Sequence, residues 1–173
     1  MVKIYVVDTN ILIQAPYALT SFEDNQVVLP LAVLEELDGL KKAEGEKGAN
    51  ARAAIRLLES LRIQGDLLEG VRLENGGLLR VEKNFVNVTL PEDLPEDRMD
   101  NRILKVCKGL ADSRQEQVIL VTKDILLRIK AQMLGIRAED FLTEQVTDKK
   151  AYSGRAEVFA PEEVFKEFKK KGI

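Results

Sequence analysis

One short stretch near the start of the chain constrains the fold more than any other. Residues 2–10 read Val-Lys-Ile-Tyr-Val-Val-Asp-Thr-Asn, and residues 4–7 form a β-branched and aromatic run without a turn residue. Such a run predicts a strand buried on both faces of a parallel sheet. The strand leads directly into Asp8, where the sheet ends and a helix is expected to begin. Because open α/β folds bind ligands at this edge, Asp8 is a candidate site residue if other acids converge on it.

Composition limits the chemistry that such a site can use. The chain has 173 residues, no histidine and one cysteine, Cys107. This excludes a disulfide within the chain, a zinc site built from imidazoles and thiolates, and a His-based triad, so any catalysis must rest on carboxylates. The hydrophobic content of 45% is enough for one domain with a sizeable core, and a formal net charge of −3 does not by itself indicate nucleic-acid binding.

The cellular location can also be predicted. No apolar run approaches the roughly 20 residues of a membrane-spanning helix, so we expect no membrane partner. No signal peptide is expected, because Met1-Val-Lys leads straight into a strand that ends in polar residues. We therefore expect a cytoplasmic protein.

Helical and strand patterns alternate along the chain, which predicts an α/β fold. Helices are expected over 9–15, 31–42, 49–63, 97–110 and 125–134, with further buried strands over 27–30 and 117–122 and an edge strand over 136–142. A β-ribbon insertion is expected at about 66–92, with a hairpin that turns at Asn75-Gly76-Gly77 and another strand over 85–90. The tail over 147–173 is less regular.

Four acids stand where they could face a common cleft: Asp8, Glu36, Asp100 and Asp124. The first and last directly follow buried strands, and the other two flank the apolar stripes of predicted helices. On the same helical wheels, Glu35 and Asn101 face away from the core. If the two strands are parallel neighbours, both aspartates emerge at the same edge of the sheet.

Each acid also has a plain structural explanation. Asp8 and Asp124 can cap helices, Asp100 follows Asp97 at the spacing of a capping box, and Glu36 can be a surface helix residue. A non-enzymatic protein with four unrelated caps is therefore one alternative. However, carboxylates this close repel one another unless a cation lies among them. Oxygen ligands suit Mg²⁺ or Mn²⁺, which can activate water and neutralise the charge that builds on a phosphodiester.

The segments that carry these acids resemble the acidic signature of PIN-domain ribonucleases. They read Val-Asp8-Thr-Asn10, Leu-Glu-Glu36-Leu-Asp-Gly-Leu, Asp100-Asn-Arg-Ile-Leu and Val-Thr122-Lys-Asp124, and the match covers about residues 2–143. The Gly-Ala-Asn-Ala-Arg segment and the tail Ala-Tyr152-Ser-Gly154 resemble the PIN half of proteins that continue into a PhoH-type ATPase. No G-x-x-x-x-G-K-[ST] motif occurs, so no ATP site is expected here. The resemblance thus suggests a truncated or stand-alone version of such a protein.

The resemblance implies a three-layer α/β/α sandwich with a central, mostly parallel sheet over residues 1–145. Residues 146–173 would then be a C-terminal extension or a linker toward an absent ATPase domain. It also implies a metal-dependent endoribonuclease whose catalytic, metal-binding residues are Asp8, Glu36, Asp100 and Asp124. The positions that would orient these acids or the attacking water are Thr9, Asn10 and Thr122. Some similar proteins carry a second acid at the position of Asn101, so the binding of one or two metal ions stays open.

The leading hypothesis is a Mg²⁺- or Mn²⁺-dependent nuclease that cuts single-stranded RNA. The candidates for contact with the phosphate backbone are Arg102, Lys123, Arg128 and Lys130. Helix-surface cations, however, more often contact only water. One alternative is a weakly active or inactive RNA-binding, regulatory module of a larger helicase–nuclease. Another is the toxin of a toxin–antitoxin pair, against which the β-ribbon and the tail argue. Homo-oligomers are common among similar proteins, so self-association stays open.

Overall fold

The computed structural model describes residues 2–141. They belong to one compact unit, Met1–Phe141, which holds a six-stranded sheet with the order β3-β4-β2-β1-β5-β6. The strands are β1 (Ile4–Val7), β2 (Gln26–Pro30), β3 (Val71–Arg72), β4 (Leu78–Glu82), β5 (Val118–Val121) and β6 (Arg137–Glu139). The helices are α1 (Thr9–Leu12), the 3₁₀ helix η1 (Pro16–Thr20), α2 (Leu31–Leu40), α3 (Gly45–Gln64), α4 (Met99–Ser113) and α5 (Ile125–Met133). The expectations for 146–173, including the tail around Tyr152, lie outside the described residues.

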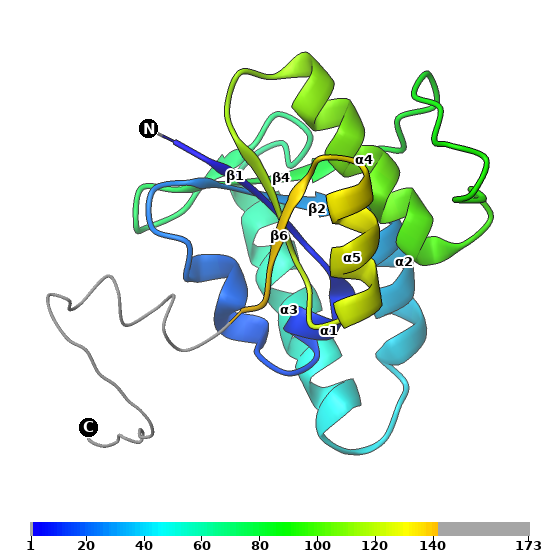
Figure 1. Ribbon diagram of the computed structural model, residues 1–173. Coiled ribbons are helices and arrows are strands. Elements are labelled where there is room, and N and C mark those ends of the chain that lie inside the picture. Colours follow the sequence, from blue (N-terminus) through cyan, green and yellow to red (C-terminus); the bar gives the residue numbers. More distant parts are fainter. Residues whose placement is uncertain (1, 142–173) are drawn as a thin grey trace, which may run out of the picture. The chain divides into compact units, whose positions relative to one another are not determined.

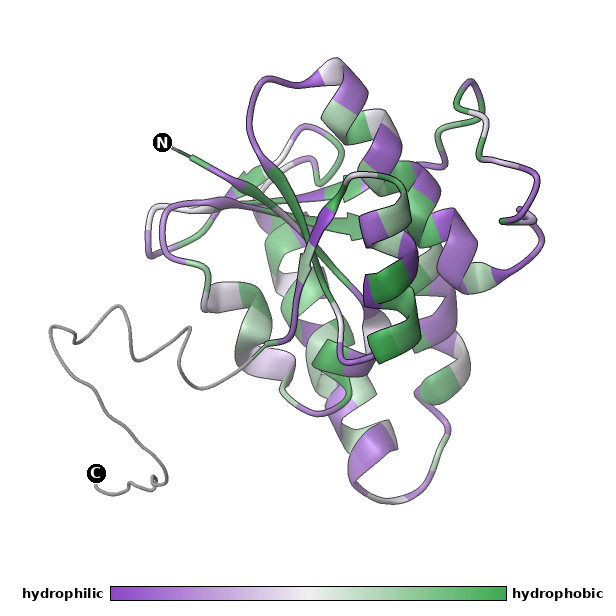
Figure 2. Ribbon diagram, in the orientation of Figure 1, coloured by the Kyte–Doolittle hydropathy of each residue, from purple (hydrophilic) through white to green (hydrophobic). Residues whose placement is uncertain are grey.

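β1 lies in the middle of the sheet because apolar side chains cover both of its faces. Ile4, Val6 and Val7 are fully buried, and Tyr5 packs on Phe22 with 4.6 Å between ring centroids. Full burial of one aliphatic side chain stabilises a fold by about 1.5–3 kcal/mol. Figure 2 shows the hydrophobic colour concentrated on the central strands.

The strand register decides where the site lies. β1 pairs in parallel with β2 on one side and with β5 on the other, as the sequence predicts. The last pair of β1 and β5 is Val7 with Val121. The two strands therefore end together, and the next residues, Asp8 and Thr122, emerge beside each other at the carboxyl edge of the sheet.

Helices cover both faces of the sheet, which gives the expected α/β/α sandwich (Figure 1). The connection from β2 to β4, through α2 and α3, and the connection from β4 to β5, through α4, run in opposite directions along the sheet. Because parallel crossovers are right-handed, these connections lie on opposite faces. Within residues 2–141, no helix is both long enough and apolar enough to span a membrane.

The predicted hairpin is present and extends the sheet. β3 and β4 pair antiparallel, and Gly76 in the turn has a φ of 93°, which favours glycine. β4 also pairs in parallel with β2 over five residues, so the ribbon joins the central sheet at its edge. The further strand expected over 85–90 is wrong. This segment forms no strand, and it turns with a hydrogen bond from the Val88 N–H to the Phe85 carbonyl at 3.1 Å.

Several helix boundaries differ from the expected ones, and two of these differences have a clear local cause. The helix expected over 9–15 ends at Leu12, because Pro16 starts a separate 3₁₀ turn. α3 begins at Gly45, four residues before the expected start. A side chain at Gly48 would lie 1.8 Å from the Ala43 carbonyl oxygen, so the close approach of the preceding turn requires glycine there. Neither difference moves the predicted acids.

Candidate active site

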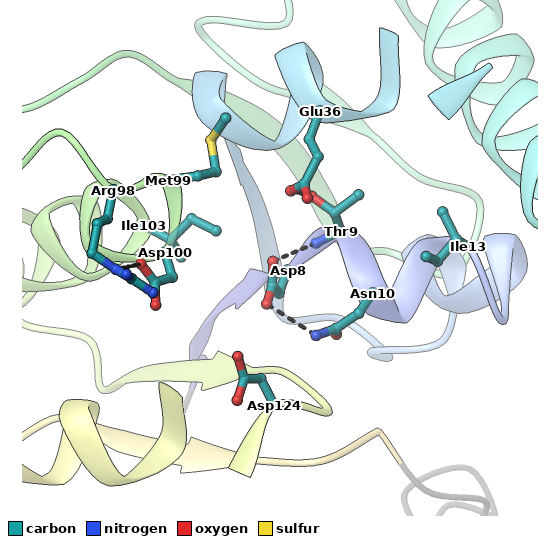
Figure 3. Close-up of a pocket in the computed structure, with 10 residues that line it drawn as sticks. All are labelled: Asp8, Thr9, Asn10, Ile13, Glu36, Arg98, Met99, Asp100, Ile103 and Asp124. Carbon is teal, nitrogen blue, oxygen red and sulfur yellow. Dashed lines mark hydrogen bonds and ion pairs between the residues drawn. The ribbon is translucent and has the colours of Figure 1, made fainter. Parts of the chain in front are cut away.

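A pocket of about 410 Å³ lies at the carboxyl edge of the sheet. Its lining residues are Asp8, Thr9, Asn10, Ile13, Glu36, Arg98, Met99, Asp100, Ile103 and Asp124. The pocket therefore brings together all four acids that the sequence singles out, and their carboxylates face a common space (Figure 3). Within the described part of the chain, however, no three acidic or sulfur-bearing side chains stand close enough together to hold a metal ion as they are.

Asp8 is the most buried of these acids, with 7% of its surface exposed. Its Oδ1 accepts a hydrogen bond from the Thr9 N–H at 2.7 Å, which is the helix cap that the sequence allows. Burial, with a smaller contribution from the charges of Glu36 and Asp124, raises the pKa of Asp8 to about 6, against the opposing hydrogen bonds from Thr122 and Thr9. Among residues 2–141, no basic side chain forms an ion pair with the ionised form of Asp8.

A polar network fixes the second oxygen of Asp8. The Thr122 hydroxyl donates to Oδ2 at 2.7 Å, and the Asn10 amide donates to the same oxygen at 3.2 Å. The Thr122 hydroxyl oxygen also accepts from the Asp124 N–H at 3.1 Å, and the Asn10 side-chain carbonyl accepts from the Lys123 N–H at 3.0 Å. These contacts tie the end of β1 to the residues that follow β5.

Glu36 enters the pocket from α2. The Thr9 hydroxyl donates to its Oε1 at 2.7 Å, so Thr9 contacts Asp8 through its backbone and Glu36 through its side chain. Glu36 is half-buried, whereas the neighbouring Glu35 is exposed, as the helical wheel predicts.

Asp124 caps α5, as the sequence allows. Its Oδ1 accepts from the N–H groups of Leu126 at 3.0 Å and Leu127 at 3.3 Å. Both hydrogen bonds use the same oxygen of the carboxylate. Capping and a position on the pocket wall are therefore compatible for this residue.

Asp100 is paired with two cations. Arg98 Nε lies 3.3 Å from Oδ1, and Lys130 Nζ lies 3.0 Å from Oδ2. Partial burial would raise the pKa of Asp100, but the hydrogen bonds and charges of Lys130 and Arg98 outweigh it and hold the pKa below its usual value. The expected capping box with Asp97 is wrong: the N-cap of α4 is Arg98, without a side-chain capping bond.

The prediction that Asn101 faces away from the core is wrong. This residue is fully buried, its amide donates to the Pro95 carbonyl at 2.8 Å, and its side-chain oxygen accepts from Lys130 Nζ at 3.2 Å. A helical wheel places a residue only relative to the main apolar stripe. It does not show that the preceding loop and α5 cover the first turn of α4.

The four predicted RNA-binding residues are not among the residues that line the pocket: Arg102, Lys123, Arg128 and Lys130. Lys123 and Arg128 both contact Asp140, at 3.2 Å and 3.7 Å. Arg102 donates to the Glu96 carbonyl at 3.3 Å. Their contact with RNA stays a prediction.

Sequence reasoning missed three residues of the pocket wall besides Ile13. Arg98 and Met99 immediately precede Asp100, and Ile103 lies one turn after it. The signal that could have identified Arg98 is its place directly before the helix that carries Asp100.

The donor set fits a hard divalent cation, because every acid in the pocket offers oxygen. In the part of the chain that the structure describes, Asp8, Glu36 and Asp124 form no ion pair with a basic side chain. Their mutual repulsion would be relieved by a cation among them. Since no three acids yet stand close enough, coordination requires side-chain movement.

Several known proteins are similar to this chain. The PIN domain family model matches residues 5–142. Protein PhoH2 of Bacillus subtilis (strain 168) is 45% identical over 175 aligned positions, which cover 97% of this chain and 40% of that protein. Protein PhoH2 of Mycolicibacterium smegmatis is 38% identical over 148 positions, which cover 84% of this chain and 33% of that protein. The chain thus spans at most about 40% of the length of these curated relatives.

Solved structures share the fold. A PilT N-terminus domain protein from Sulfolobus solfataricus superposes with a TM-score of 0.55 at 12% identity, covering 89% of this chain and 99% of that one. A domain of a functionally unknown protein from Methanocaldococcus jannaschii superposes with a TM-score of 0.50 at 20% identity, covering 91% and 98%. At these identities the likeness concerns the fold alone.

Proposed function

Because the chain belongs to the PIN domain family, we propose that it is a Mg²⁺- or Mn²⁺-dependent endoribonuclease that hydrolyses phosphodiester bonds of single-stranded RNA. One observation carries the proposal: four carboxylates from separate elements converge on a single pocket at the carboxyl edge of the sheet. The location is the one at which open α/β sheets bind ligands.

The residues proposed to hold the metal are Asp8, Glu36, Asp100 and Asp124. A bound divalent ion would activate a water molecule and neutralise the charge that develops on the phosphate. Thr9 holds Glu36, while Thr122 and Asn10 hold Asp8, and such hydrogen bonds orient ligands and keep them ionised.

Phosphate contact is best supported for Arg98. Its side chain is 62% exposed and lines the pocket, so it can bind a phosphate oxygen at little cost in desolvation. The other proposed contacts are Arg102, Lys123, Arg128 and Lys130. Of these, Lys123 and Arg128 would first have to leave Asp140.

A cleavage assay on end-labelled single-stranded RNA tests the proposal. We expect cleavage with Mn²⁺, loss of cleavage with EDTA, and loss in Asp8→Asn. The matched control is Asp38→Asn, because Asp38 is an exposed acid of α2 that pairs with Lys41. Cleavage by Asp8→Asn in the presence of EDTA would contradict the metal mechanism.

The second candidate function is an RNA-binding regulatory module. The observation that favours it is the length of the PhoH2 relatives, which is consistent with a fused PhoH-type domain that would complete the activity. This function predicts that the chain retains labelled RNA on a filter with no turnover at any Mn²⁺ concentration. Turnover by the chain alone would exclude it.

A further inference from the structure

Lys130 reaches from α5 to the first turn of α4 and binds two neighbouring side chains there. Its ammonium nitrogen lies 3.0 Å from Oδ2 of Asp100 and 3.2 Å from Oδ1 of Asn101. The Lys130 side chain is 24% exposed, compared with 62% for Arg98, the other partner of Asp100. Lys130 is therefore a fixed cation at the edge of the site, whereas Arg98 can turn toward solvent.

The cations divide the site into two halves. In one half, Asp8, Glu36 and Asp124 have no basic partner among the described residues. In the other half, Lys130 and Arg98 already neutralise Asp100, and Asn101 adds a neutral amide instead of a further charge. One divalent ion is therefore favoured beside the three acids without a basic partner, and the charge of Asp100 is already compensated, so it does not attract a second ion.

Counting formal charges gives the same result. The four carboxylates carry four negative charges, and Lys130 and Arg98 carry two positive ones. The remaining charge of minus two is what one divalent ion neutralises. A second divalent ion beside Asp100 would share one carboxylate with the Lys130 ammonium and would be repelled by it.

We propose that the Lys130 ammonium takes the place of a second divalent cation beside Asp100, so that the pocket binds one Mg²⁺ or Mn²⁺ ion and not two. This inference rests on the proposed function, because it concerns the same site. Lys130 thereby acts as a positioning residue: it holds Asp100 on the pocket wall and sets the metal stoichiometry. Its direct contact with RNA is not needed.

Replacing Lys130 by glutamate tests the proposal. A Lys130→Glu side chain would place a carboxylate opposite Asp100. Adjacent oxygen ligands of an octahedral ion lie about 3 Å apart, since each Mg²⁺–oxygen bond is about 2.1 Å long. Lys130 Nζ lies 3.0 Å from Oδ2 of Asp100, so a carboxylate oxygen near that position could share an ion with Asp100.

The measurement is the number of Mn²⁺ ions bound per chain, by equilibrium dialysis and by calorimetry, on the whole chain. We expect one ion for the wild type and two for Lys130→Glu. For the neutral Lys130→Gln we expect one ion with a dissociation constant lowered about fivefold. The matched control is Lys108→Gln. Lys108 lies about two helical turns after Asp100 on α4 and pairs with Asp112, so its replacement should change neither the number of bound ions nor their dissociation constant.

The possible failures are distinguishable. Two ions on the wild type, or one ion with wild-type affinity on both Lys130 variants, would overturn the inference while leaving the nuclease proposal intact. No Mn²⁺ bound to the wild type would overturn the metal mechanism itself. Thermal melting of each variant checks the fold, and Lys130→Gln provides a second test if Lys130→Glu does not fold.

Discussion

The Thr122 hydroxyl donates a 2.7 Å hydrogen bond to Oδ2 of Asp8, across 114 positions of the sequence. The contact follows from the parallel register of β1 and β5, which end together at Val7 and Val121. Asp8 is therefore held where two paired strands end. Its orientation is set before any ligand binds, as catalytic groups require.

The first prediction concerns Thr122. Thr122→Val keeps the shape of this fully buried side chain but removes the hydroxyl, which donates to Asp8 and accepts from the Asp124 N–H. We expect a loss of about 1–3 kcal/mol in unfolding free energy and a fall in RNA cleavage. Thr122→Ser, which restores the hydroxyl, should recover the cleavage rate. Urea denaturation and the cleavage assay measure the two effects, and full activity of the valine variant would contradict the role.

A second prediction concerns the pH dependence of stability without metal. The pKa of Asp8 is about 6 in the folded protein, against about 3.9 in an unfolded chain. The folded state therefore holds the proton more tightly, and stability falls as the pH rises from about 4 to about 6. A difference of two pKa units corresponds to a loss of about 3 kcal/mol in the free energy of unfolding over this pH range.

The Asp8→Asn variant should lack this fall, because its side chain does not titrate. The unfolding free energy of the wild type relative to the variant should therefore decrease between pH 4 and pH 6.5, as measured by urea denaturation in EDTA. Parallel curves for the two proteins would show that the pKa of Asp8 is not raised. Adding Mn²⁺ at pH 7 should stabilise the wild type and leave the variant unchanged.

A third prediction compares two adjacent acids of α2. Glu36 faces the pocket and accepts from Thr9, whereas Glu35 is exposed and lies 4.0 Å from Arg102. Glu36→Gln should lower kcat for RNA cleavage by about 100-fold or more, because losing one transition-state contact of this kind costs about 3 kcal/mol. Glu35→Gln should stay within twofold of the wild type. Equal effects of the two substitutions on kcat would show that Glu36 has no role in the reaction.

A fourth prediction concerns Arg98. Arg98→Gln should raise KM for RNA severalfold and reduce the slope of log affinity against log salt by about one, since one phosphate contact is lost. The control is Arg62→Gln on α3, because Arg62 is exposed and pairs with Glu59. An unchanged salt slope would show that Arg98 does not contact the phosphate backbone.

The central strands could be predicted from the sequence because their signal is local. Residues 4–7 and 118–121 are uninterrupted apolar runs, and short runs of this kind are typical of buried parallel strands. Once these strands are neighbours, their shared edge brings Asp8 and Asp124 to one pocket. The positions of Glu36 and Glu35 followed from the period of a single helix.

The predictions that failed depended on contacts between elements. The burial of Asn101 depends on Lys130 and on the loop at Pro95, neither of which a helical wheel contains. The pairing of Lys130 with Asp100, about which the sequence made no prediction, joins residues 30 positions apart on different helices. Local periodicity carries no information about either of these.

Anomalous scattering from a crystal soaked in Mn²⁺ tests the central claim most directly. If the acids of the pocket hold a divalent ion, one peak should appear in the pocket, within about 2.5 Å of Asp8 and of at least one other carboxylate among Glu36, Asp100 and Asp124. The claim also predicts that the peak disappears in Asp8→Asn. A saturating soak that gives no peak in the pocket, or a peak that persists in Asp8→Asn, would contradict the claim.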